Sequence, residues 1–178
     1  MRFLDADAVA ALGPAAAVQA VIDALRGGLD PAVDPARVSV DLTNGQFLLM
    51  LSETLTAAGV KVVTVAPDNP THGLPRVQAV YLLFDRDTLA PRAVLDGTAL
   101  TTLRTPAVSV AAVLGRLPDR ALRVAVIGAG PQASGHISTL AAVRPLEDAT
   151  YLVRDPSRTP LEHNRAWHGA SGRCVALR

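Results

Sequence analysis

Apolar side chains recur at helical spacing near the start of the chain. In the segment 14–27 they lie three or four positions apart, at Val18, Val21, Ile22 and Leu25. This spacing places them on one face of a helix, and Pro14 suits its first turn. A shorter helix is predicted over 5–12, because Asp5 or Asp7 can cap it. The chain is therefore expected to open with two helices.

Between residues 37 and 95 the pattern changes to short apolar runs bounded by turn residues. The predicted strands are Arg37–Leu42, Phe47–Leu51, Val60–Ala66, Val77–Phe84 and Ala93–Leu95. The segments between them are rich in Gly, Pro, Asn and Asp, which favour turns. No helical pattern separates these strands, so they predict an antiparallel or mixed sheet. Helical spacing returns from Thr98 to Leu117, where Pro106 lies in the first turns or marks a kink.

The third part of the chain has the order strand, turn, helix, strand. The apolar run Arg123–Ile127 leads into a Gly-x-Gly-x-x-Ala turn, and a second apolar run, Ala149–Val153, follows. Gly128 allows a tight turn, Gly130 lets a pyrophosphate approach the main chain, and Ala133 lets the helix pack closely on the strand. The N-terminus of that helix attracts phosphate groups. The pattern predicts the start of a dinucleotide-binding Rossmann domain, and the alternative is an ordinary strand–turn–helix.

The residues after the second apolar run bear on the choice of dinucleotide. At this position an acidic residue favours the free ribose hydroxyl of NAD, whereas Arg favours the 2′-phosphate of NADP. Arg154 and Arg158 stand on either side of Asp155, so the balance favours NADP over NAD. The alternative is a solvated loop in which Asp155 caps the next turn.

Composition excludes several classes of protein. The chain has 178 residues, 49% of them hydrophobic, which suffices for one large or two small domains. A net charge of +1 and 3% aromatic residues give no basis for binding nucleic acid or an anionic membrane. No apolar run reaches the ~20 residues of a membrane span, and the N-terminus lacks the apolar core of a signal peptide. We therefore expect a soluble, cytoplasmic protein.

Cysteine and histidine give no indication of a metal site. The single Cys174 excludes an internal disulfide and a Cys-rich metal site. His72 and His136 have no acidic or Cys partners at ligand spacing, so no metal is expected there. The terminal residues His163, Trp167 and His168 are expected in an exposed helix or loop.

Four sequence blocks carry a resemblance to a known family. They are Gly59–Val63, Asn69-Pro70 with Gly73–Val80, Ala93–Gly97 running into Leu100–Ser109, and the Gly128–Ala133 turn. In this order and spacing they resemble the ornithine cyclodeaminase/mu-crystallin family, and Pro35-Ala36-Arg37 fits its N-terminal part. The resemblance implies an α/β domain over 1–118 that binds substrate and forms a homodimer. It also implies a partial NAD(P)-binding Rossmann domain over 119–178.

The resemblance also implies a site. Family members transfer hydride at the α-carbon of amino acids or cyclic imines, so the substrate carboxylate must be held. The matching positions are Arg37, Lys61 and Arg104; Arg can grip a carboxylate with two hydrogen bonds, and Lys adds a compact charge. A solvent-exposed position is the alternative for each. Arg76 stands where many relatives have a small hydroxyl residue, so it would narrow the pocket or add an anion contact.

The family's cofactor positions match Gly130 and Gln132, and the alternative for Gln132 is a plain surface side chain. No aspartate matches the acid/base of relatives. Asp96 lies in a different motif and is expected to cap the helix near Thr98. Relatives are also much longer, so we expect a shortened chain that stops just after the second Rossmann strand.

The expected function is that of an ornithine cyclodeaminase-like oxidoreductase without its catalytic C-terminal half. Cyclodeaminase, amino-acid dehydrogenase and ketimine reductase chemistry all stay open, as does the identity of the amino acid or imine. The alternative is a non-catalytic dimer that binds an amino acid or a nucleotide.

Overall fold

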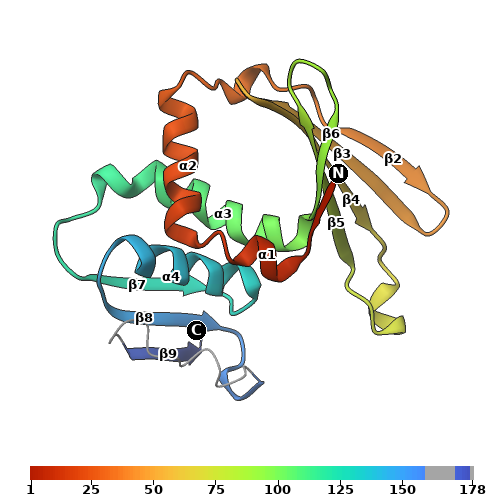
Figure 1. Cartoon of the computed structure of the whole chain (residues 1–178). Coiled ribbons are helices and arrows are strands. Elements are labelled where there is room, and N and C mark those ends of the chain that lie inside the picture. The colour runs from red at the N-terminus through yellow and green to blue at the C-terminus, as the bar shows by residue number, and fades with distance from the viewer. Residues whose placement is uncertain (159–170, 177–178) are drawn as a thin grey trace. The chain divides into compact units, whose positions relative to one another are not determined.

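The structure, a computed structural model, describes residues 1–158 and 171–176. The chain forms two compact units (Figure 1). The first unit contains Met1–Leu12 and Asp23–Thr101, and the second contains Gly13–Ile22 and Thr102–Arg178. The units thus divide inside two helices, Pro14–Arg26 and Gly97–Val113, and the two-domain boundary at 118–119 stays a prediction.

The first unit is built on a six-stranded mixed sheet with the order β1-β6-β5-β4-β3-β2. Its strands are β1 (Arg2–Leu4), β2 (Val38–Leu42), β3 (Gly45–Glu53), β4 (Ala57–Val65), β5 (Val77–Asp85) and β6 (Pro91–Asp96). Neighbours from β2 to β6 are antiparallel, whereas β1 is parallel to β6. The predicted antiparallel or mixed sheet is confirmed. The pattern missed β1, because three residues are too few to show a period.

The two faces of this sheet differ in burial. On β4 the alternate residues Gly59, Lys61 and Val63 are buried, and we call their side the Lys61 face. The opposite side, the apolar sheet face, carries two apolar rows across the strands. The rows are Val38-Leu49-Val62-Val80 and Leu51-Val60-Leu82-Val94-Phe3. Val38, Leu51 and Val80 remain 42–46% exposed.

Helices form where the apolar spacing predicts them. The helix α1 spans Ala6–Ala10, and its cap is Asp5, which accepts a hydrogen bond from the Ala8 N–H at 2.9 Å. The helix α2 spans Pro14–Arg26. Short 3₁₀ turns occupy Pro31–Val33 (η1), Asn69–His72 (η2), Leu114–Arg116 (η3) and Pro156–Arg158 (η4). Among the described residues, no helix has the length and apolar character needed to cross a membrane.

The helix α3 (Gly97–Val113) follows β6 without a loop. The Ala99 N–H donates to Asp96 Oδ1 at 2.8 Å, so the predicted capping role of Asp96 is confirmed. A Cβ on Gly97 would lie 2.8 Å from the backbone of Ala79 and Val80, so a side chain here would push the helix away from β5. Pro106 lies inside the helix and is buried.

Replacing Asp96 with alanine is expected to lower the free energy of unfolding by about 1 kcal/mol, the usual value of a helix cap. Urea denaturation followed by circular dichroism measures this change. Asp119→Ala is the matched control, because Asp119 is exposed and lies outside every helix. Equal effects of the two substitutions would contradict the capping role.

The second unit holds a three-stranded parallel sheet with the order β7-β8-β9. Its strands are β7 (Leu122–Ile127), β8 (Leu146–Val153) and β9 (Ser171–Ala176), and the helix α4 (Pro131–Val143) connects β7 to β8. The expectation that the chain stops after the second Rossmann strand is wrong, since β9 pairs with β8 along its whole length. The pattern missed β9 because Gly172 and Arg173 break its apolar run.

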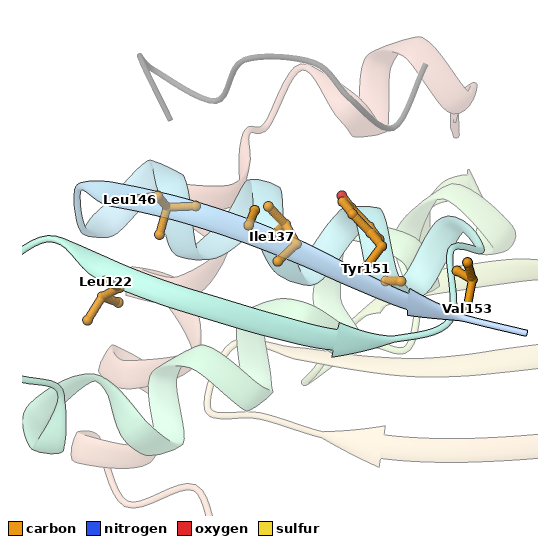
Figure 2. Packing of buried hydrophobic residues seen from close by; sticks show 7 residues of the cluster. Leu122, Ile137, Leu146, Tyr151 and Val153 are labelled. Atoms are coloured by element: carbon orange, nitrogen blue, oxygen red, sulfur yellow. The ribbon is translucent and has the colours of Figure 1, made fainter. Parts of the chain in front are cut away.

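The core of the second unit lies between α4 and the sheet. Figure 2 shows Ile137 of α4 with Leu122, Leu146, Tyr151 and Val153 of β7 and β8. Ile137 and Tyr151 have no exposed surface. This strand–helix–strand unit places the glycine turn at the end of β7.

Candidate functional site

The glycine turn joins β7 to the N-terminus of α4. Gly128 has φ +96°, a left-handed conformation that favours glycine, and its N–H donates to the Leu152 carbonyl at 2.8 Å. The helix begins with Pro131 after Gly130, which offers no side chain as a cap. The amide groups of the first turn are therefore available to a phosphate.

Gly130 fits a dinucleotide for a reason that the fold alone does not supply. Its φ of −79° suits any residue, and a Cβ built on it would meet no described atom within 4 Å. Neither backbone strain nor packing requires glycine here. A ligand close to the main chain would require it. By contrast, Ala133 is buried beside Ile137, where a small residue lets α4 lie close to the sheet.

The residues after β8 adopt the alternative that the sequence left open. Arg154 and Asp155 are exposed. Asp155 Oδ1 accepts hydrogen bonds from the Ser157 N–H at 3.0 Å and the Ser157 hydroxyl at 2.6 Å, so it caps the turn η4. Arg158 ends that turn. Their contact with a ribose or a 2′-phosphate stays a prediction.

Lys61 lies in the middle of β4 and is only 9% exposed. Its ammonium donates a long hydrogen bond of 3.5 Å to the Thr101 hydroxyl, which donates to the Gly97 carbonyl at 2.7 Å. Lys61 is thus held at the first turn of α3, where the helix dipole adds positive potential. Burial of an ammonium is costly unless polar or anionic groups contact it. This environment favours binding of an anion.

The strand register brings Arg37 into line with Lys61. Arg37 precedes the Val38–Leu49 pair by one position, and Met50 pairs with Lys61. Arg37, Met50 and Lys61 therefore form one row across three strands. The Cα atoms at its two ends are ~10 Å apart, or two strand spacings. Arg37 is exposed, so a long side chain that is accessible to solvent flanks the buried cation.

Tyr81 extends this row and was missed by the sequence analysis. It pairs with Lys61, and a Cβ on Gly59 would collide with its hydroxyl. Burial raises the pKa of the Tyr81 hydroxyl above its ordinary value, and the Asp34 carboxylate raises it further. Tyr81 therefore stays a neutral hydrogen-bonding group beside Lys61. A tyrosine within an apolar strand, directly after the motif block Gly73–Val80, was the available signal.

The other two predicted cations are Arg76 and Arg104. Arg76 is exposed and directly precedes β5. It stands five positions before Tyr81, about 17 Å along the strand, and its odd offset gives it the opposite side of the sheet. The structure therefore does not bring Arg76 into the row of Lys61. Arg104 is exposed on α3 in the second unit, and its meeting with Lys61 stays a prediction.

Two further features concern the described residues. A cavity of about 750 Å³ in the first unit is lined by Gly59, Asp34 and Leu51, but not by Lys61. No group of three His, Cys, Asp or Glu side chains could hold a metal ion in the part of the chain that the structure describes. The positions His163, Trp167 and His168 lie outside the described residues.

Comparison with known proteins decides the family. The sequence profile of the ornithine cyclodeaminase/mu-crystallin family matches residues 9–166. The chain belongs to this family. Its mixed α/β fold, with a Rossmann-like part, agrees with the resemblance carried by the four sequence blocks.

Three known proteins illustrate what the chain is similar to. Over 119 residues the chain is 35% identical to a Delta(1)-pyrroline-2-carboxylate reductase of Bacillus cereus, which covers 65% of the chain and 37% of that protein. The reductase of Thermococcus litoralis, solved with NADH and L-proline, superposes with a TM-score of 0.83 at 29% identity, covering 99% of this chain and 57% of that one. An archaeal alanine dehydrogenase dimer with bound NAD gives 0.79 at 25% identity, covering 100% and 56%. The chain thus covers 37% of the Bacillus reductase and 56–57% of the two solved structures.

Proposed function

We propose that the chain provides substrate- and dinucleotide-binding residues of an NAD(P)-dependent oxidoreductase that acts on an α-amino acid or its cyclic imine. The observation that carries this proposal is the burial of Lys61 on the Lys61 face of the sheet, in the row that contains Arg37. A buried cation matches a ligand carboxylate. The names of two relatives include Delta(1)-pyrroline-2-carboxylate and L-proline. Both compounds carry a carboxylate beside the reacting carbon.

The candidate residues divide between two ligand groups. Arg37, Lys61 and Arg104 bind the carboxylate, whereas Arg76, on the opposite side of the sheet from Lys61, is left out of this clamp. The Gly128–Ala133 turn binds the pyrophosphate. Bound NAD(P)H would supply a hydride to the imine carbon, and a proton would complete the amine at nitrogen.

The dinucleotide contacts extend beyond the glycines. Gln132 is exposed in the first turn of α4, within reach of a phosphate or ribose that approaches Gly130. We assign the 2′-phosphate of NADP to Arg154, with Arg158 beside it, and therefore expect tighter binding of NADPH than of NADH. Tighter binding of NADH would instead indicate that Asp155 contacts the free ribose hydroxyl of NAD.

The partner in this proposal is a second copy of the chain. The apolar sheet face leaves Phe3, Val38, Leu51 and Val80 exposed, and exposed patches of this kind mark association surfaces. Pairing of two such faces about a twofold axis would bury both.

Replacing Gly130 with alanine is expected to weaken dinucleotide binding about fivefold to tenfold, because the added methyl occupies the space next to the main chain. Stability should not change, since the methyl meets no described atom. Isothermal titration calorimetry with NADH and NADPH measures the affinity. Gly115→Ala, also at a glycine with open space around it, is the matched control. Equal affinity of the two variants would contradict dinucleotide binding at Gly130.

The reaction itself is tested with the whole protein. Oxidation of NAD(P)H by a cyclic imino acid indicates a reductase, whereas ammonia release from ornithine without net cofactor consumption indicates a cyclodeaminase. A protein that binds amino acids or nucleotides and supports neither reaction would favour a non-catalytic role.

A further inference from the structure

The helices α3 and α4 meet at a close crossing in the second unit. A Cβ on Gly135 would lie 3.0 Å from Pro106 Cγ and 3.2 Å from the Thr102 carbonyl. Real Cβ atoms rarely come so close to a neighbour, so glycine lets the two helices touch here. The adjacent Ala107 and Val110 of α3 are buried.

One hydrogen bond between side chains spans this crossing. His136 Nε2 lies 3.0 Å from the Ser109 hydroxyl, and His136 Nδ1 lies 2.7 Å from the Gln132 carbonyl. A carbonyl only accepts, so Nδ1 carries the proton in the neutral ring and Nε2 is the acceptor. Ser109 therefore donates its single hydroxyl hydrogen to His136 Nε2, and the Thr105 carbonyl at 3.2 Å shares that hydrogen as the longer branch of a three-centre bond.

The bond connects two segments that the proposed function uses separately. Ser109 lies on α3, little more than one turn after Arg104. His136 lies on α4, and its bond to the Gln132 carbonyl ties it to the first turn after Gly130. We propose that His136 and Ser109 are positioning residues, which fix the helix of Arg104 against the dinucleotide-binding turn. This inference rests on the proposed function. It adds the contact that fixes the distance between Arg104, which binds the carboxylate, and the turn that binds the dinucleotide.

A nucleophilic role for Ser109 fits the geometry less well. An activated serine needs nearby donors for an oxyanion. Ser109 lies inside α3, where neighbouring backbone N–H groups are engaged in the helix. The arrangement thus favours a structural role, in which the hydrogen bond holds α3 against α4.

The positioning role predicts a specific pattern of affinities. NADH binding depends on the turn and on α4, which packs on β7 and β8 through its own core, so it should change by less than about twofold in variants of the pair. Pyrrole-2-carboxylate is a flat, unreactive carboxylate that probes Arg104. In the wild type, bound NADH should increase the affinity for pyrrole-2-carboxylate, and we call this factor the coupling. In the variants the coupling should be about three- to tenfold smaller.

The variants separate the two bonds of His136. His136→Asn keeps an amide near the position of Nδ1 and loses the reach to Ser109. His136→Gln places an amide near the position of Nε2, so it should restore the coupling. Ser109→Ala removes the donor, and the double variant His136→Asn/Ser109→Ala should be no worse than either single one. Ser138→Ala is the matched control, because its hydroxyl donates to the Ser134 carbonyl within α4 at 2.9 Å.

Calorimetric titration of pyrrole-2-carboxylate, with and without saturating NADH, gives the coupling for each variant. Full coupling in His136→Asn and Ser109→Ala would overturn the inference and leave the proposed function standing. Equal losses in Ser138→Ala, or no coupling in the wild type, would overturn it as well. A wild-type chain that binds neither NADH nor NADPH would refute the proposed function, and the inference would fall with it.

Discussion

Replacing Lys61 or Arg104 with alanine is expected to weaken the binding of carboxylate ligands about ten- to hundredfold. Each substitution removes a charge-assisted hydrogen bond, which contributes about 1.5–3 kcal/mol. For Lys61 the contact would form at a residue that is only 9% exposed, so water and salt screen it little. Calorimetry with L-proline and pyrrole-2-carboxylate measures the loss.

Two further variants make this experiment specific. Lys61→Met removes the charge and keeps the length of the side chain, so it separates lost binding from a cavity left in the sheet. Arg116→Ala is the control for Arg104→Ala, because Arg116 is also exposed and lies in η3. Unchanged affinity in Lys61→Met and Arg104→Ala would refute carboxylate binding by these residues.

Glutamate at Val38 or Leu51 is expected to convert a dimer of this chain into monomers. Both residues lie on the apolar sheet face and are 42–46% exposed, so the single chain tolerates a charge there. In a twofold dimer the substitution occurs twice, and burial of unpaired carboxylates costs several kcal/mol. The dimer dissociation constant should rise at least about a hundredfold.

Light scattering and sedimentation at micromolar concentration measure this change. Ser39→Glu is the matched control, since Ser39 is exposed on β2 next to Val38 and on the other face of the sheet. A wild-type chain that is monomeric at these concentrations would refute the dimer. So would a Val38→Glu variant with the wild-type mass.

The elements with a clear period were predictable from the sequence, and those without one were not. The run Val77–Phe84 became Val77–Asp85, and Ala93–Leu95 became Pro91–Asp96, because apolar strands between turn residues have few alternatives. The pairing of β1 with β6, and of β9 with β8, depends on strands far away in the sequence. Short strands of this kind are stabilised by their partners, which local patterns do not contain.

The residues of the candidate site were likewise predictable only where the signal is local in the sequence. The glycine turn depends on local backbone geometry, so Gly128 and Gly130 could be identified directly. Alternation puts Lys61 on the side of Gly59 and Val63, but only the packed sheet shows that this is the buried side. The row with Tyr81 and the bond between Ser109 and His136 join residues from separate elements. No single segment of sequence indicates them.

Lys61 is also the only lysine among the 178 residues. Apart from the N-terminal amine of Met1, which is 82% exposed, its side chain is the sole primary amine of the protein. An amine-selective acylating reagent should therefore add a first label rapidly at Met1 and a second label slowly at Lys61. The mass of the intact chain distinguishes the two steps. The delay before the second label, compared with that in the unfolded chain, would record how often the Lys61 amine becomes accessible, without any ligand or mutation.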